Sequence, residues 1–217
     1  VRKETKDSTQ RRVPLSPEQV ARLVGDFGLH VRVQSMPKRV FEDRDYIAAG
    51  AELTDDLSPC NVVFGVKEIA PGYMLDGMAY VFFSHTIKAQ PYNMAMLRHI
   101  LDHRITLIDY ELIKNADGHR TVFFGNYAGL AGMIDTLWTL GQRLRVLGIE
   151  TPFVALSPAH TYDGLGMAKA AVQGVGERIA AEGLPAELAP LVVGFTGYGN
   201  VSSGAQEIFD LLPHDDV

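Results

Sequence analysis

Leu191-Val-Val-Gly-Phe-Thr-Gly197 is a short apolar run of the kind that forms a buried strand, and Tyr198-Gly-Asn-Val-Ser-Ser-Gly-Ala-Gln-Glu-Ile-Phe209 follows it directly. The second stretch predicts a glycine-rich turn that opens a helix. A dinucleotide-binding unit begins in this way, because glycines and the N-terminus of a helix cradle a phosphate. Ser202 stands where the third glycine of the usual pattern would be. The residues that we predict to contact a dinucleotide are Gly197, Gly199, Ser202 and Gly204.

Only the beginning of such a nucleotide domain is expected in this sequence. One βαβ unit takes about 30 residues, and an acidic contact to the ribose lies about 20 residues beyond the glycines. The sequence stops at Val217, soon after the expected helix. We therefore predict a substrate-binding domain over residues 1–150, followed over 151–217 by a linker helix and the start of a truncated dinucleotide-binding domain.

Composition places the chain among ordinary globular proteins. It has 217 residues, of which 47% are apolar and 21% charged. The formal net charge of −6 argues against nucleic acid as the main partner. The single cysteine, Cys60, excludes an internal disulfide and a cysteine-cluster metal site. Without an apolar run of membrane-spanning length or a signal-peptide pattern, we expect a cytoplasmic protein that does not enter a membrane.

Hydrophobic spacing alternates between strand and helix patterns along the chain. Ser16-Pro-Glu-Gln19 predicts a capped helix start, and Gly28 ends that helix. Further helices are expected over 43–49, 93–103, 126–147 and 163–182, and strands over 30–33, 61–66, 80–84, 105–108 and 121–124. This alternation predicts an α/β fold with a mostly parallel, Rossmann-like sheet.

Polar residues follow three of the expected strands. Lys67-Glu68, the segment from Ser84 to Lys88, and Asp109-Tyr-Glu111 each come directly after an apolar run. Because ligands collect at the carboxyl ends of strands in an open parallel sheet, we expect these three groups to converge at one rim. Arg120 stands before the last expected strand, at the end of a turn.

These residue types suit proton transfer and the binding of anions. A histidine such as His85 titrates near neutrality, and a partly desolvated lysine such as Lys67 can exchange protons near the working pH. Glu68 or Glu111 beside them would set their charge. Arg12 could hold a carboxylate through a two-pronged contact.

Each of these residues also has a plainer interpretation. Lys67 could simply be the polar residue that ends a strand, and His85 could be a hydrogen-bonded structural histidine. Arg12 could be solvated charge. His99 and His103 lie one helical turn apart, which is a spacing that metal ligands use. Since no third ligand is nearby in the sequence, a helix surface explains the pair, and we expect no metal site.

A series of motifs resembles one known family. RKETKDSTQRRVPLSPEQV, GVKEI, FFSHTIKAQ, LIDYELI, GHRTVFFGNYAGLAGMID, TPF and FTGYGNVSSGAQEIF occur in this order across essentially the whole chain. Together they resemble the lysine–ketoglutarate reductase part of the bifunctional aminoadipic semialdehyde synthases. More distantly, the chain is similar to lysine-forming saccharopine dehydrogenase and to the N-terminal domain of alanine dehydrogenase and transhydrogenase.

The resemblance implies two Rossmann-like domains that face each other across a cleft, and an oxidoreductase of lysine metabolism. Lysine, 2-oxoglutarate and NADH or NADPH would give saccharopine, or the reverse. It further implies that Lys67 and His85 are the acid–base pair. Residues on the substrate side would be Arg12, Glu68, Glu111 and Arg120.

Two other functions stay open at this point. One is a non-catalytic module that binds a 2-oxo acid or an amino acid, and the other is an alanine-dehydrogenase-like enzyme. The sequence leaves open the choice between NAD and NADP, the direction of the reaction, and whether the partner is a second copy or a complementing chain. The expected ligands are small molecules in every case.

Overall fold

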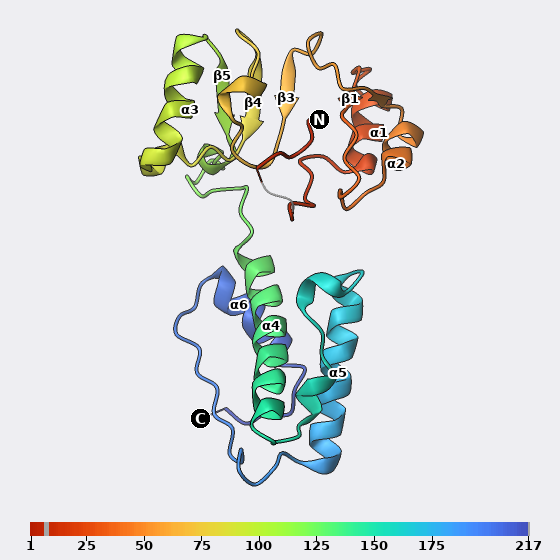
Figure 1. The fold of residues 1–217 in the computed structure, drawn as a ribbon, viewed down its shortest axis with the longest axis vertical. Coiled ribbons are helices and arrows are strands. Elements are labelled where there is room, and N and C mark those ends of the chain that lie inside the picture. Colours follow the sequence, from red (N-terminus) through yellow and green to blue (C-terminus); the bar gives the residue numbers. More distant parts are fainter. Residues whose placement is uncertain (7–8, 217) are drawn as a thin grey trace. The chain divides into compact units, whose positions relative to one another are not determined.

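A computed structural model describes residues 1–6 and 9–216, and the chain divides into two compact units, Val1–Phe123 and Phe124–Val217 (Figure 1). The division falls just before helix α4 (Gly125–Val146), whereas the expected domain boundary lies at residue 150, behind that helix. The assignment of the two parts to substrate and nucleotide stays a prediction.

The first unit is built on parallel strands. Three of them, β3 (Val62–Phe64), β4 (Ala79–Phe82) and β5 (Thr106–Asp109), form one sheet in the order β3-β4-β5. A second parallel pair joins β1 (Arg32–Val33) to β2 (Glu52–Leu53). The predicted strands over 30–33, 61–66, 80–84 and 105–108 are therefore confirmed, with bounds that are shorter or shifted by one residue.

The N-terminal segment lies between the two sheets. The backbone N–H of Arg2 donates to the carbonyl of Phe64 at 3.0 Å, and the N–H of Gln34 donates to the carbonyl of Val1 at 3.0 Å. One side of this segment therefore bonds to β3 and the other to the residue after β1. Residues 1–6 are carried along the edge of β3 towards its carboxyl end.

Helix α3 (Pro91–Asp102) packs on the three-stranded sheet. Its Met96 and Ile100 are buried in one cluster with Tyr80 and Phe82 of β4. Burial of side chains of this size contributes about 1.5–3 kcal/mol each, so the core fixes the strand ends from which the polar residues emerge.

Helices α1 (Pro17–Gly25) and α2 (Asp43–Ala48) pack on the β1–β2 pair. The predicted capping box is confirmed, because Gln19 N–H donates to Ser16 Oγ at 3.3 Å and Ser16 N–H donates to Gln19 Oε1 at 2.8 Å. Gly28 follows with φ of +63°, a left-handed conformation that glycine adopts without strain.

The second unit is helical. Helix α4, helix α5 (Leu165–Glu182) and helix α6 (Asn200–Phe209) share a core that includes Ile134, Val172 and Ile208. No helix in the described part of the chain is long and apolar enough to cross a membrane. Short 3₁₀ turns complete the two units: η1 (Pro71–Tyr73), η2 (Thr86–Lys88), η3 (Tyr110–Leu112), η4 (Pro152–Ala155) and η5 (Ala159–Thr161).

Two expected strands are not paired in the structure. Residues 191–197 are exposed at alternate positions, as in a strand, but among the described residues no other strand pairs with them. Residues 121–124 form no strand and lead into α4. The antiparallel bridge from Lys114 to Arg120 ends just before them, and Thr121 N–H donates to the carbonyl of Ile113 at 3.1 Å. A strand needs a neighbour for a series of backbone hydrogen bonds, and among the described residues neither segment makes such a series.

Candidate active site at the carboxyl ends of the sheet

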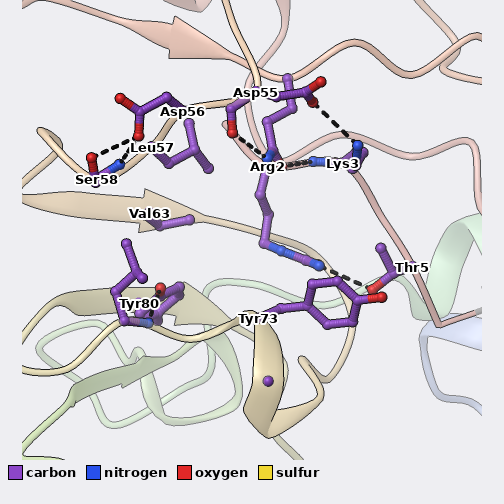
Figure 2. A pocket seen from close by; sticks show the side chains of 13 residues that line it. Arg2, Lys3, Thr5, Asp55, Asp56, Leu57, Ser58, Val63, Tyr73 and Tyr80 are labelled. Atoms are coloured by element: carbon purple, nitrogen blue, oxygen red, sulfur yellow. Dashed lines mark hydrogen bonds and ion pairs between the residues drawn. The ribbon is translucent and has the colours of Figure 1, made fainter.

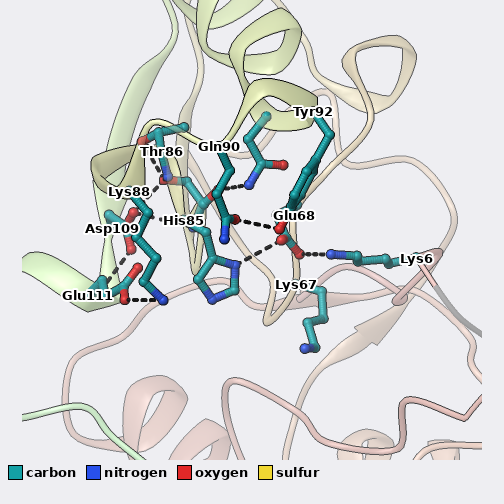
Figure 3. Close-up of polar contacts among 12 residues, drawn as sticks. Lys6, Lys67, Glu68, His85, Thr86, Lys88, Gln90, Tyr92, Asp109 and Glu111 are labelled. Carbon is teal, nitrogen blue, oxygen red and sulfur yellow. Dashed lines mark hydrogen bonds and ion pairs between the residues drawn. The ribbon is translucent and has the colours of Figure 1, made fainter.

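The polar groups that follow β3, β4 and β5 converge, as the sequence predicts (Figure 3). His85 Nδ1 lies 2.8 Å from Glu68 Oε1, which joins the group after β4 to the group after β3. Lys88 Nζ lies 3.1 Å from Glu111 Oε1, which joins the group after β4 to the group after β5. Two contacts therefore join the three groups along the rim, and we call these side chains the rim network.

Glu68 stands at the centre of one half of this network. Its side chain is only 8% exposed, and its second oxygen, Oε2, accepts a hydrogen bond from Lys6 Nζ at 2.6 Å. Burial acts to raise the pKa of this carboxyl, but hydrogen bonds from Lys6, His85 and its own backbone outweigh burial and lower the pKa to about 2. Glu68 is therefore a fixed negative charge beside the imidazole of His85.

The backbone of His85 adopts a conformation that is rare for residues with a side chain. Its φ is +52°, in the left-handed region, at the position where η2 begins. The preceding residue is held from two sides, because Asn93 Nδ2 donates to the carbonyl of Ser84 at 3.0 Å and Ser84 N–H donates to Asp109 Oδ2 at 3.3 Å. These bonds turn the chain at the end of β4 and aim the imidazole at Glu68.

Lys67 leaves the end of β3 next to Glu68. Its backbone N–H donates to Glu4 Oε2 at 3.0 Å, whereas the half-buried side chain makes no hydrogen bond or ion pair to another described residue. Figure 3 shows the tips of Lys67 and His85 extending to the same side of the Glu68 carboxylate, with no direct bond between the two. An ammonium held in place by its backbone but without a partner is suited to act on a bound molecule.

Glu111 stands at the centre of the other half of the network. Arg120 Nη1 lies 3.6 Å from its Oε1, the same oxygen that pairs with Lys88. The side chain is 7% exposed, and its Oε2 is buried with no hydrogen-bond partner in the described structure. Both cations are about half exposed, so they can turn towards an anion outside the network.

Arg12 and the predicted cofactor residues lie in other parts of the chain. Arg12 is exposed, and its Nε donates to Gln10 Oε1 at 2.9 Å. Gly197 and Gly199 form the exposed turn before α6, and Ser202 Oγ accepts a hydrogen bond from Gln206 at 2.8 Å. Gly204 instead faces α4, where a Cβ would collide with the carbonyl of Asn126.

The α6 N-terminus fits the phosphate of a dinucleotide in part. Gly199 caps the helix with extended backbone, and no atom lies within 4 Å of a Cβ added to Gly197 or Gly199, so a ligand has free access to the turn. The packing of Gly204 on α4 is a structural role that is independent of any phosphate.

The histidine pair at the C-terminal end of α3 makes a ring contact and one contact to a carboxylate. The ring centroids of His99 and His103 are 4.0 Å apart, and His103 Nδ1 lies 2.9 Å from Asp76. Across the residues that the structure describes, no group of three or more candidate ligands could hold a metal ion.

A pocket of about 290 Å³ lies elsewhere in the first unit, between the N-terminal segment and β3 (Figure 2). Two of its charged side chains already have partners within the lining: Lys3 pairs with Asp55 at 3.2 Å, and Arg2 Nη2 donates to Thr5 Oγ1 at 3.0 Å. Neither Lys67 nor His85 lines it. The strand ends are therefore the candidate site, and this pocket is separate from it.

Two residues of the site were missed by sequence reasoning. Lys6 and Glu4 both contact the end of β3 from 62 residues away in the sequence. The RKETK stretch is recognisable as part of the family pattern, but nothing in its spacing indicates which strand it would meet. Only the path of the N-terminal segment along β3 brings them to the site.

Comparisons with known proteins agree with this architecture. Alpha-aminoadipic semialdehyde synthase of Arabidopsis thaliana is 49% identical over 97% of this chain and 20% of its own length. The mitochondrial enzyme of that name from Bos taurus is 42% identical over 98% of this chain and 23% of its own length. The NAD(+), L-lysine-forming saccharopine dehydrogenase of Yarrowia lipolytica is 29% identical over 61% of this chain and 37% of its own length. The chain thus spans only about a fifth to a quarter of the first two relatives.

The fold has a counterpart among solved structures and family models. An L-alanine dehydrogenase superposes with a TM-score of 0.52 at 24% identity, over 66% of this chain and 39% of the enzyme, which shows a shared fold. Residues 1–131 match the family model described as alanine dehydrogenase/PNT, N-terminal domain. Since that match covers more than half of the chain and includes the whole rim from Glu4 to Arg120, the chain belongs to the alanine dehydrogenase/PNT N-terminal domain family.

Proposed function

We propose that the chain is the substrate-side part of an oxidoreductase of lysine metabolism that acts on the CH–NH bond of saccharopine. In the reductive direction, lysine and 2-oxoglutarate condense and the product is reduced to saccharopine. The observation that carries this proposal is the group formed by Lys67, His85 and the Glu68 carboxylate at the strand ends. The names of the plant and bovine relatives point to the same pathway.

Imine formation needs two proton transfers, which this group can supply. The ε-ammonium of lysine must lose a proton before it attacks the keto carbon, and the carbinolamine hydroxyl must receive a proton before it leaves as water. Lys67 and His85 have different surroundings, because the side chain of Lys67 has no partner among the described residues and His85 is bonded to Glu68. Such a pair can divide the roles of acid and base between its members.

The cations of the rim suit the carboxylates of these substrates. Lys88 and Arg120 share the single oxygen Glu111 Oε1, and both are about half exposed. A dicarboxylate could draw either cation away from Glu111, and arginine offers a two-pronged contact to it. The buried Glu111 Oε2 would then be available to accept a hydrogen bond from a substrate amine. Arg12 is proposed as a further carboxylate contact.

A nicotinamide cofactor, when bound, would supply the hydride that reduces the imine. Gly197, Gly199 and Ser202 at the start of α6 are the residues that we propose to approach its phosphates, with Gly204 supporting the helix behind them. Since the acidic or basic residue that selects NAD or NADP lies about 20 residues past the glycines, the described turn carries no preference. The relative from Yarrowia lipolytica is named as an NAD(+) enzyme.

The cellular compartment stays a prediction. The sequence favours the cytoplasm, whereas the name of the bovine relative places that protein in mitochondria.

The oxidation of NADH or NADPH, followed by the loss of absorbance at the nicotinamide band, tests the function. The chain and the full-length polypeptide that carries it are each mixed with lysine and 2-oxoglutarate. We expect turnover by the full-length polypeptide only when both substrates are present. Binding of 2-oxoglutarate or lysine without turnover in both proteins would favour a binding module instead, and turnover with pyruvate and ammonia would favour an alanine dehydrogenase.

A further inference from the structure

Glu4 is a buried carboxylate with both of its oxygens engaged at the end of β3. Its side chain is 2% exposed. Oε1 accepts a hydrogen bond from the N–H of Val66 at 2.8 Å, and Oε2 accepts one from the N–H of Lys67 at 3.0 Å. A carboxylate that bridges two successive backbone N–H groups fixes the direction in which the chain leaves the strand.

The N-terminal segment explains why a side chain takes this role. Residues 1 and 2 run along β3 and pair with it by backbone, through the bond from Arg2 N–H to the carbonyl of Phe64. Beyond that point Val66 and Lys67 still present N–H groups, and Glu4 supplies acceptors in place of a backbone carbonyl. Buried N–H groups without acceptors are costly, so the two bonds hold the segment and the strand end together.

Glu4 is itself held in place. Arg2, whose side chain is 4% exposed, has its Nη1 3.8 Å from Glu4 Oε1 and its Nη2 bonded to Thr5. Gly65 makes room for both residues: a Cβ there would lie 3.2 Å from Arg2 Cδ and 3.4 Å from Glu4 Oε1. A buried group of three residues, Arg2, Glu4 and Gly65, therefore surrounds the strand end that carries Lys67.

We propose that Glu4 is a positioning residue of the site, which acts by fixing the backbone of Lys67 so that Lys67 and Glu68 face His85. The inference rests on the proposed function for the roles of Lys67 and His85. The bonds to the backbone of Val66 and Lys67 stand independently of it. Glu4 touches no reacting atom in this account.

The first test does not depend on activity. NMR of the labelled chain can detect a scalar coupling through a hydrogen bond between the Lys67 amide nitrogen and the Glu4 carboxyl carbon. We expect that coupling in the wild type. In Glu4→Gln the side-chain NH₂ replaces one carboxylate oxygen and would face a backbone N–H, so we expect the Val66 and Lys67 amide protons to move upfield. The exposed Glu18→Gln is the matched control and should leave both signals unchanged. Absence of the coupling overturns the proposal.

The second test uses the full-length polypeptide. Glu4→Gln and Glu4→Asp, which keeps the charge but draws the carboxylate back by one methylene, should each lower kcat by about 10- to 100-fold, as expected when a reacting group is displaced by about 1 Å. The KM of each variant should stay within about twofold of the wild-type value. Its kcat should remain low even at temperatures far below its melting temperature, where the variant is folded. A normal kcat in folded Glu4→Gln overturns the positioning role.

The two proposals fail in distinguishable ways. If the wild-type full-length polypeptide does not turn over, the proposed function fails. The coupling and the shift of the Lys67 amide proton in Glu4→Gln then decide the positioning claim alone. If the wild type turns over and Glu4→Gln does so equally well, only the positioning claim fails.

Discussion

Nδ1 of His85 and Oε1 of Glu68 lie 2.8 Å apart, although 17 residues separate the two in sequence. The contact exists because β3 and β4 are adjacent parallel strands, and each residue follows the carboxyl end of its own strand. A buried carboxylate with its pKa lowered to about 2 thereby lies against an imidazole whose backbone is held in the left-handed region. This pair is the structural basis of the predictions below.

Glu68 should stabilise the fold in a pH-dependent way. Its carboxyl has an ordinary pKa of 4.5 and a folded pKa of about 2, so the stabilisation is fully present above pH 4.5 and is lost as pH falls towards 2. Glu68→Gln should therefore flatten the fall in unfolding free energy over this window, and it should destabilise the protein at neutral pH by about 1–3 kcal/mol. Urea unfolding at stepped pH measures both effects. If the unfolding free energy of Glu68→Gln fell between pH 4.5 and 2 as it does in wild type, the lowered pKa of Glu68 would be contradicted. Glu18→Gln is the control.

Gly204 should be required for the contact between α6 and α4. A Cβ at this position would collide with the backbone of Asn126, so Gly204→Ala is expected to destabilise the protein by about 1–3 kcal/mol. Gly174 in α5 is the matched control, because nothing lies within 4 Å of a Cβ there. Gly174→Ala should stabilise by up to about 1 kcal/mol. Equal effects of the two substitutions on the melting temperature would show that α6 does not pack as described.

The segment over 191–197 should exchange its amide protons rapidly in the isolated chain. Its backbone N–H groups make no backbone hydrogen bond to any described residue, whereas Tyr80 in β4 is buried and paired on both sides. Hydrogen exchange followed by NMR compares the two. Protection in 191–197 equal to that in β4 would mean that this segment has a strand partner.

Lys67 and His85 should act in chemistry and not in binding. Lys67→Met and His85→Gln in the full-length polypeptide are each expected to lower kcat by about 100-fold or more, with KM changed far less. Lys114→Met, at an exposed lysine outside the rim, is the control. A wild-type rate in either variant removes that residue from the proton transfers.

Much of the fold was predictable because it rests on local signals. The capping box depends only on the four consecutive residues from Ser16 to Gln19. The apolar runs that form β3, β4 and β5 are short, buried and flanked by turns. Convergence of Glu68, His85 and Glu111 followed from one rule about parallel sheets. The resemblance to the family supplied their roles, which the geometry alone does not test.

The remainder depends on contacts that spacing does not encode. Residues 191–197 have the composition of a strand, but a strand forms only against a partner. Glu4 reaches Lys67 across 63 residues, and its role depends on the path of the N-terminal segment. Gly204 was predicted for a phosphate, and its packing against Asn126 appears only when α4 and α6 are seen together.

We expect this site to join the ε-amine of lysine to the keto carbon of 2-oxoglutarate. Mass spectrometry of the product formed by the full-length polypeptide from lysine labelled with ¹⁵N at the ε-position, 2-oxoglutarate and reduced nicotinamide measures this directly. The account predicts saccharopine that retains the label in its new C–N bond, and none from the Lys67→Met variant. No labelled saccharopine from the wild type, or as much of it from Lys67→Met as from the wild type, would contradict it.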